Sequence, residues 1–329
     1  MLITQTPLRI SLAGGGTDFR DFYEQEDGFV VSSAIDKFVY VIVKERFDEK
    51  IYLNYSQKEI VEDVDEIQHE LVREAMRMTG VTRGVEVTTL ADIPSEGSGL
   101  GSSSSLTVGL LNAFHMYHGE QVTAEQLAQE ACEIEIERCG KPIGKQDQYI
   151  AAYGNLRNFR FKGDGTVDTE RLMLSDHRKR LLGSNLLLFY TGQTRSSSEI
   201  LTEQRSNILD RMEILHRLKE FGFEARHAIA ENDFDDVGRI LGESWTYKKQ
   251  MAGKITNARI DEMYARALEA GALGGKVSGA GGGGFLLLYV PRERQNAVRG
   301  ALSAYRELPF FLEEDGSKVI FNVRRYSTR

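Results

Sequence analysis

Residues 94–105 combine glycines and hydroxyl side chains in a pattern suited to holding phosphate. They read Pro-Ser-Glu-Gly-Ser-Gly-Leu-Gly-Ser-Ser-Ser-Ser and lead directly into an apolar, helix-like segment. The glycines let backbone N–H groups turn inward around an anion, and the helix N-terminus adds unpaired N–H groups and the positive end of its dipole. Because flexible linkers seldom lead straight into a buried amphipathic helix, we predict a phosphate cradle here. The residues expected to line it are Gly97, Gly99, Leu100, Gly101, Ser102, Ser103 and Ser104.

A second glycine-rich stretch, residues 276–284, contains the letters Gly-x-Gly-x-x-Gly in the wrong context for a dinucleotide site. That fingerprint follows a strand and opens a helix, whereas these residues lead into the strand-like run 285–290. We interpret the glycines as positions where the backbone passes close to another loop or to a ligand. The chain also lacks the Gly-x-x-x-x-Gly-Lys-Ser/Thr loop of P-loop enzymes and the His-Arg-Asp and Asp-Phe-Gly motifs of protein kinases.

A third stretch, residues 7–18, reads Pro-Leu-Arg-Ile-Ser-Leu-Ala-Gly-Gly-Gly-Thr-Asp. A predicted strand carries Arg9, and the three glycines then turn the chain so that Thr17 and Asp18 follow. The Asp18 carboxylate could accept hydrogen bonds from the vicinal hydroxyls of a sugar. Its alternative role is that of a turn aspartate capping the helix that follows.

In this order the three stretches resemble the three motifs of the GHMP superfamily, which includes galactokinase, homoserine kinase and mevalonate kinase. The resemblance covers nearly the whole chain. Residues 12–18, 144–149 and 190–195 are similar to the branch that contains heptose 7-phosphate kinases and fucokinases. Galactokinases have Gly-Glu-His where this chain has Gly-Gly-Gly at positions 14–16, so galactose is a less favoured acceptor.

The resemblance implies an α+β fold of two domains, with ATP and a sugar in the cleft between them. The N-terminal domain, residues 1–170, would be of the ribosomal protein S5 domain 2 type, and the C-terminal domain, residues 171–329, would be ferredoxin-like. The implied activity is Mg²⁺-dependent transfer of the γ-phosphoryl group of ATP to a sugar, most like C1 of D-glycero-D-manno-heptose 7-phosphate. The alternatives are a fucokinase-like or other hexose 1-kinase, a non-catalytic sugar sensor, and a GHMP decarboxylase.

By position, the resemblance also implies roles for individual residues. Asp147 matches the catalytic aspartate, and Arg9 matches the basic residue that orients and polarises the acceptor hydroxyl. Ser103 and Glu135 match the magnesium ligands. Arg9 near Asp147 would keep that carboxylate ionised and ready to accept a proton, although the residues alone leave open a base, an orienting group or a helix cap. The residues expected around the acceptor are Gly15, Gly16, Thr17, Asp18, Arg195 and Gly281.

A phosphate already present on the acceptor would need a cationic anchor. Arg195 stands at an apparent helix start beside three serines, and a guanidinium fork matches phosphate oxygens. We therefore predict that Arg195 holds a C7 phosphate. A contact to a hydroxyl or to the domain interface is the alternative, because fucokinase-like relatives share this stretch.

Helical periodicity supports Glu135 independently of the resemblance. At about 100° per residue, Glu135 lies among Ala128, Ala131 and Cys139, on the packed side of its helix. A carboxylate placed there is costly unless a cation meets it. The remaining acidic residues of this segment are expected on a solvated face: Glu130, Glu133 and Glu137.

Two other clusters have simpler interpretations. His115 and His118 are spaced as a metal pair, but no third ligand is evident, so we interpret them as part of an amphipathic helix surface. An aromatic pair, Trp245 and Tyr247, precedes two lysines in the manner of a nucleic-acid stacking site. In an acidic chain we favour helix packing for it.

The elements that must position these residues are read from periodicity. Strands are expected at residues 28–35, 38–43, 51–55, 85–90, 155–161, 186–190, 274–277, 285–290 and 318–323. Helices are expected after residue 101, from Thr123 with a capping box to Gln126, and over most of residues 196–271. This mixture lacks the steady strand–helix rhythm of a doubly wound sheet and indicates two α+β domains meeting near residues 160–185.

Composition limits the partners. The chain has 329 residues, with 41 Lys and Arg against 49 Asp and Glu, which gives a net charge of −8 and disfavours nucleic acid. The two cysteines, Cys132 and Cys139, indicate core residues in a reducing compartment. Neither a signal peptide nor an apolar run of roughly 18 residues is evident, so we expect a cytoplasmic protein without membrane contact. A monomer and a homodimer are both left open.

Overall fold

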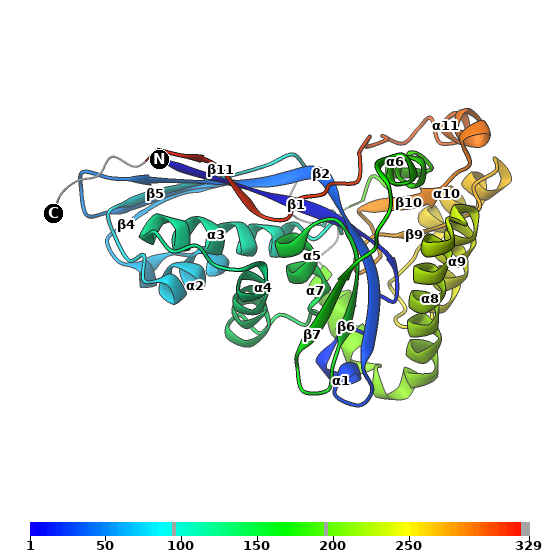
Figure 1. The fold of residues 1–329 in the computed structure, drawn as a ribbon, viewed down its shortest axis with the longest axis horizontal. Helices are drawn as coiled ribbons and strands as arrows, with labels where there is room; N and C mark the ends of the chain where they lie inside the picture. Colours follow the sequence, from blue (N-terminus) through cyan, green and yellow to red (C-terminus); the bar gives the residue numbers. More distant parts are fainter. Residues whose placement is uncertain (94–96, 194–196, 324–329) are drawn as a thin grey trace.

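Two β-sheets organise the computed structural model, which describes residues 1–93, 97–193 and 197–323 (Figure 1). In the larger sheet the strand order is β11-β1-β2-β5-β3-β4, and β6 pairs with both β2 and β7. The smaller sheet has the order β8-β10-β9. The strands are β1 Leu2–Ala13, β2 Gly28–Glu45, β3 Ile51–Asn54, β4 Lys58–Val61, β5 Val85–Ala91, β6 Leu156–Phe161, β7 Val167–Arg171, β8 Leu186–Tyr190, β9 Gly274–Val277, β10 Phe285–Tyr289 and β11 Lys318–Asn322.

Strands β1 and β2 form the long antiparallel pair at the centre of the larger sheet. The sequence predicted two strands where β2 is continuous. Asp36 and Lys37 look like a break, but they stand opposite a register shift between Pro7 and Leu8, so the pairing continues past them. The short strands β4 and β7 were missed because no buried residue marks either of them.

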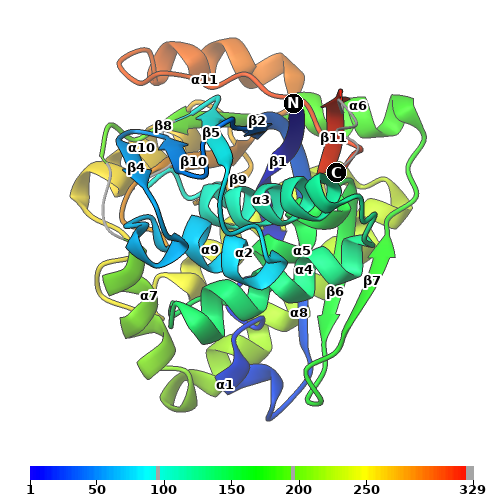
Figure 2. The ribbon, with the colours of Figure 1, turned by 90° about the vertical axis from the view of Figure 1, so that its left-hand side faces the viewer.

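Helices α2 to α5 line one face of the larger sheet (Figures 1 and 2). Helix α3 contacts both β1 and β2, and α2, α4 and α5 pack around it. Thr123 accepts a hydrogen bond from the Gln126 backbone N–H at 3.2 Å, which confirms the predicted cap of α4. The helices of the first half are α1 Arg20–Tyr23, α2 Glu70–Thr79, α3 Ser102–His118, α4 Ala124–Cys132, the π-helical segment η2 Glu133–Arg138 and α5 Gln146–Tyr153.

The second half is largely helical, as its periodicity predicted. Helices α8 and α9 pack against each other and against the strands of the smaller sheet. Residues 249–257 are not helical and interrupt the predicted run. The helices are α6 Asp176–Ser184, α7 Ser197–Ser206, α8 Met212–Glu231, α9 Phe234–Lys248, α10 Ala258–Glu269 and α11 Gln295–Ala301, and short 3₁₀ turns lie at Val64–Glu66, Leu209–Arg211 and Arg292–Arg294.

Apolar contacts join the two halves where the site lies. Leu8, Ile10 and Leu12 of β1 share one buried cluster with Phe221 of α8 and Leu241 of α9. The last strand, β11, pairs antiparallel with β1 and so returns to the sheet of the first half. A single boundary at residues 170/171 does not foresee that return. In the described ranges, none of the helices is both long and apolar enough to span a bilayer.

Candidate active site

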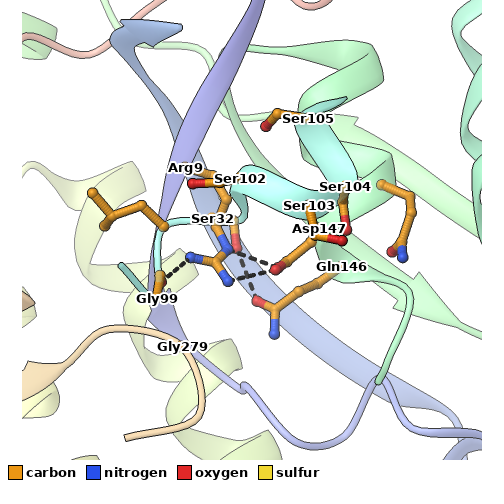
Figure 3. Close-up of polar contacts among 12 residues, drawn as sticks. Arg9, Ser32, Gly99, Ser102, Ser103, Ser104, Ser105, Gln146, Asp147 and Gly279 are labelled. Atoms are coloured by element: carbon orange, nitrogen blue, oxygen red, sulfur yellow. Dashed lines mark hydrogen bonds and ion pairs between the residues drawn. The ribbon is translucent and has the colours of Figure 1, made fainter. Parts of the chain in front are cut away.

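An ion pair between Arg9 and Asp147 forms the centre of the site (Figure 3). Arg9 projects from the middle of β1, and Asp147 stands in the first turn of α5. The Arg9 Nε and Nη2 atoms donate to the two Asp147 carboxylate oxygens at 2.7 and 2.6 Å. Arg9 is 4% exposed and the Asp147 side chain 23% exposed, so the carboxylate forms the accessible side of the pair. The sequence brought these two residues together correctly across 138 positions.

Arg9 also fixes the glycine-rich loop ahead of α3. Its Nη1 atom donates to the Gly99 carbonyl at 2.6 Å, and its backbone N–H donates to the Leu100 carbonyl at 3.0 Å. Gly101 has a φ of +79°, and a Cβ there would lie 3.2 Å from the Arg9 Cγ atom and 3.4 Å from an Asp147 oxygen. Glycine is therefore required at this position by both backbone conformation and space.

The predicted phosphate cradle has the expected form in its described part. Gly97 and Gly99 adopt left-handed φ values of +70° and +72°, and helix α3 begins at Ser102. The first N–H groups of this 17-residue helix have no partner within the helix. Ser103 is exposed at that end, whereas Ser105 is buried and donates to the Pro7 carbonyl at 2.7 Å. Positions 94–96 of the predicted stretch lie outside the described residues.

Glu135 is fully buried beneath the same helix end, as its periodicity predicted. It lies in η2, where the chain winds as a π-helix. Its two carboxylate oxygens accept four hydrogen bonds of 2.7–2.9 Å from neutral groups, namely Ser103, Ser104 and Thr107 hydroxyls and the Gln148 amide.

A hard divalent cation fits this arrangement. A buried carboxylate with neutral donors retains its negative charge, and the exposed Ser103 hydroxyl lies on its accessible side. Oxygen ligands of this kind suit Mg²⁺. The described residues contain no cluster of three His, Cys, Asp or Glu side chains that could hold a metal by itself, so phosphate oxygens and water would complete the coordination.

The loop of the third motif is built from the inside. The Thr17 hydroxyl donates to the carbonyls of Gly14 and Phe29 and accepts from the Phe29 N–H, so Thr17 shapes the loop, although it was predicted to contact substrate. Asp18 accepts from the Gly16 N–H at 3.0 Å and from the Gln146 N–H at 3.2 Å. Asp18 therefore caps α5, a distant helix, rather than the helix that follows it in sequence.

Asp18 is 2% exposed, and burial raises its pKa, an effect that the hydrogen bond from Gly16 opposes. Its bond to the first residue of α5 holds the Asp147 turn against the glycine loop. Gly15 lies next to this junction, because a Cβ there would be 3.6 Å from the Gln146 side-chain nitrogen. These contacts place Gly15, Gly16 and Asp18 beside the ion pair.

The glycine stretch 276–284 passes close to the phosphate loop, as predicted, and leads into strand β10. A Cβ on Gly279 would lie 2.7 Å from the Gly99 Cα, and one on Gly284 would lie 2.5 Å from the Ser98 carbonyl. Gly281, predicted to contact substrate, packs instead against Ile255, whose carbonyl would be 2.6 Å from a Cβ. Arg195, the predicted phosphate anchor, lies outside the described residues.

Two lysines near the ion pair were not predicted as site residues. The Lys248 ammonium donates to the Gly279 carbonyl at 2.6 Å, and Lys248 lines a small recess together with Gly15 and Gly16. Lys276 of β9 is 4% exposed and acts electrostatically on Lys248. The sequence held a signal for Lys248, which follows Leu241 and Trp245 on the buried stripe of α9. Trp245 itself is 1% exposed, which confirms helix packing for it.

The interpretation of His115 as helix surface was wrong. His115 is buried, and its ring nitrogens contact Glu130 at 2.7 Å and Glu120 at 3.2 Å. The hydrogen bond to Glu130 raises the His115 pKa. Glu130 is accordingly half-buried rather than solvated, whereas Glu133 and Glu137 are exposed as expected. His115 thus joins α3 to α4 and leaves no nitrogen for a metal.

Comparisons with known proteins agree with this geometry. A family model described as GHMP kinases N terminal domain matches residues 56–155, and one described as GHMP kinases C terminal matches residues 225–307. The chain is 31% identical over 311 residues to the D-glycero-alpha-D-manno-heptose 7-phosphate kinase of Campylobacter jejuni, covering 90% of this chain and 91% of that protein.

Two further relatives were found in other Bacteroides species. The chain is 29% identical over 343 residues to L-fucokinase/L-fucose-1-P guanylyltransferase of Bacteroides fragilis, covering 90% of this chain but 35% of that longer protein. A crystal structure titled as a D-glycero-D-manno-heptose 1-phosphate kinase from Bacteroides thetaiotaomicron superposes with a TM-score of 0.82 at 26% identity, covering 99% of this chain and 100% of that one.

Proposed function

This chain belongs to the GHMP kinase family and is an ATP-dependent phosphotransferase acting on a sugar, and we propose that its acceptor is D-glycero-D-manno-heptose 7-phosphate. In this proposal the γ-phosphoryl group moves to the anomeric C1 hydroxyl and gives the 1,7-bisphosphate for the synthesis of a GDP-heptose nucleotide sugar. The acceptor rests on the names of the Campylobacter jejuni and Bacteroides thetaiotaomicron relatives.

The observation that carries the chemistry is the Arg9–Asp147 pair beside the start of α3. Phosphoryl transfer needs positioning and charge neutralisation more than covalent help. We assign Asp147 to accept the hydrogen bond, and then the proton, of the C1 hydroxyl as its oxygen attacks the γ-phosphorus. The bond from the γ-phosphorus to the β-phosphate bridging oxygen breaks, and ADP leaves. Arg9 holds the Asp147 carboxylate in place and stabilises the charge that develops beside it.

The glycine loop and the first turn of α3 would bind the ATP phosphates through backbone N–H groups. Ser103 and Glu135 would hold Mg²⁺, which when bound neutralises the phosphate charge during transfer. Asp18 and Gly15 would form the wall on the acceptor side, since they lie between the ion pair and the second half of the chain.

A fucokinase-like hexose 1-kinase is the second candidate. The Bacteroides fragilis relative favours it, because that match covers 90% of this chain at nearly the same identity. A non-catalytic sugar sensor has less support, since Arg9, Ser103, Glu135 and Asp147 are all present and their side chains lie at one helix end.

A panel of acceptors tests the proposal. Purified enzyme with ATP and Mg²⁺ is given heptose 7-phosphate, the unphosphorylated heptose, L-fucose, galactose and mannose, and ADP release is followed for each. We expect the highest kcat/KM with heptose 7-phosphate. A higher kcat/KM with L-fucose would replace the proposed acceptor with the second candidate.

A further inference from the structure

Lys276 carries an ammonium group in a place where one is costly. It belongs to β9, whose four residues are all buried, and it is itself 4% exposed. Within residues 1–93, 97–193 and 197–323 it makes neither a hydrogen bond nor an ion pair. A buried cation without a partner is strongly unfavourable, so this position calls for an anion.

Lys248 reaches the same region from α9. Its ammonium holds the Gly279 carbonyl, and Gly279 packs directly on Gly99 of the phosphate loop. On its other side Lys248 lines the recess formed with Gly15 and Gly16. The lysine thus lies between the two glycine loops, and it makes no ion pair to a described carboxylate.

The nearby negative charges already have other partners. Both Asp147 oxygens accept from Arg9, and those of Asp18 accept from backbone N–H groups of the neighbouring loops. Burial and the positive charges of Lys248 and Arg9 lower the pKa of Lys276 well below its usual range. Burial, reinforced by Arg9, lowers the pKa of Lys248 to about 8, and Asp18 and Asp147 oppose that change. A dianion here would restore both ammonium charges.

We propose that Lys248 and Lys276 form a phosphate subsite in the cleft, between the Gly15–Gly16 turn and the Gly99–Gly279 contact. Lysine ammonium groups bind phosphate as compact charges with several donors. The inference rests on the proposed function in that the phosphate belongs to a reactant. Two sources share this chemistry, namely a phosphate already on the acceptor and the γ-phosphoryl group in transfer.

The variants are Lys248→Met and Lys276→Met, and Lys249→Met is the matched control. Lys249 is the neighbouring residue of Lys248 and is 34% exposed, with Asp261 3.9 Å away. Replacing an unpaired buried charge by a similar apolar side chain is neutral or stabilising. We therefore expect both site variants to fold, with melting temperatures in the absence of ligand equal to or above that of the wild type.

Two measurements follow on each protein. Calorimetry with inorganic phosphate is carried out on enzyme saturated with ADP and Mg²⁺, and kcat/KM is determined for heptose 7-phosphate and for the unphosphorylated heptose. We expect the site variants to lose phosphate binding and the control to retain it. A kcat/KM loss of roughly 10- to 100-fold, the size expected for a charged hydrogen bond, should accompany it.

The two acceptors distinguish the source of the phosphate. A loss confined to heptose 7-phosphate assigns the subsite to the acceptor, and an equal loss on both, with weakened phosphate binding, assigns it to the transferred group. Equal losses with unchanged phosphate binding, or no loss beyond that of Lys249→Met, would overturn the proposal. If the wild type phosphorylates another sugar instead, the proposed acceptor fails, while phosphate calorimetry still tests the subsite.

Discussion

At the scale of residues, Arg9 does more than neutralise a carboxylate. Three of its side-chain nitrogens donate hydrogen bonds, two to Asp147 and one to the Gly99 carbonyl, so one guanidinium fixes both the proton acceptor and the phosphate loop. Because the guanidinium is planar, the Asp147 carboxylate is held in one orientation.

Asp147→Asn tests the proton acceptor. The amide keeps the shape of the side chain but accepts a proton poorly, so kcat should fall by roughly 10²–10⁴ while the affinity for ATP changes little. Initial rates and ATP binding measured on the same preparation check this. Near-wild-type turnover would reassign Asp147 to a structural role at the start of α5.

Lys248 gives the reaction a pH dependence. Its pKa of about 8 is below the usual lysine value of 10.5, so the free enzyme carries the ammonium charge below about pH 8 and loses it above. With the proposed acceptor, kcat/KM should therefore fall as pH rises through about 8, where the acceptor phosphate is already doubly charged. Lys248→Met should lack this alkaline limb. A limb that persists in the variant would assign the titration to another group.

At the scale of elements, the glycine loops are fitted to each other rather than merely flexible. Gly99 and Gly80 have nearly the same φ, +72° and +73°, but a Cβ at Gly99 would lie 2.3 Å from the Ser278 carbonyl, whereas one at Gly80 would meet nothing within 4 Å. Gly80 follows α2, and Gly99 joins the phosphate loop to β9.

This pair separates backbone strain from contact. Gly80→Ala should cost about 1–2 kcal/mol of unfolding free energy, the cost of a left-handed conformation. Gly99→Ala should cost more and also weaken ATP binding, because the loop must move from Ser278. Urea unfolding and nucleotide titration of both variants check this. Equal stability losses with unchanged ATP affinity would contradict the fitted contact.

The link between α3 and α4 depends on pH through His115. The Glu130 hydrogen bond raises the His115 pKa above 6.5, so the stability that it gives is full below about pH 6.5 and is lost as pH rises through the folded value. Burial acts to raise the Glu130 pKa, but bonds from His115 and Gln126 outweigh it and lower the pKa below 4.5, so its contribution is lost as pH falls through that lowered value.

We expect the wild type to exceed His115→Gln in unfolding free energy most near pH 5–6, and the difference to shrink towards pH 9. Denaturant unfolding of both proteins across this range provides the measurement. A difference that grows with pH would mean that His115 is neutral in the folded state.

At the scale of the whole molecule, the site is a junction of three distant segments. Strand β1 supplies Arg9, α5 supplies Asp147, and β9 with α9 supplies the lysines. The motifs predicted the first two because glycines and charges at fixed spacing mark them locally. Glu135 was predictable because its helical phase contradicts its charge.

The remainder depended on tertiary contacts that local patterns do not carry. Asp18 caps a helix 128 positions away, and β11 returns to β1 although it lies at the other end of the chain. His115 was assigned to the surface because its partner Glu130 comes from the next helix. In β9, Lys276 follows two glycines, and only the assembled cleft reveals that its charge has no partner.

Transfer of phosphate to C1 is the central claim, and NMR of the product measures it directly. Enzyme, ATP and Mg²⁺ are incubated with heptose 7-phosphate labelled with ¹³C at C1. The account predicts that the C1 signal splits through coupling to the new phosphorus as an equal amount of ADP forms. ADP release with an unsplit C1 signal, or coupling at another carbon, would contradict it.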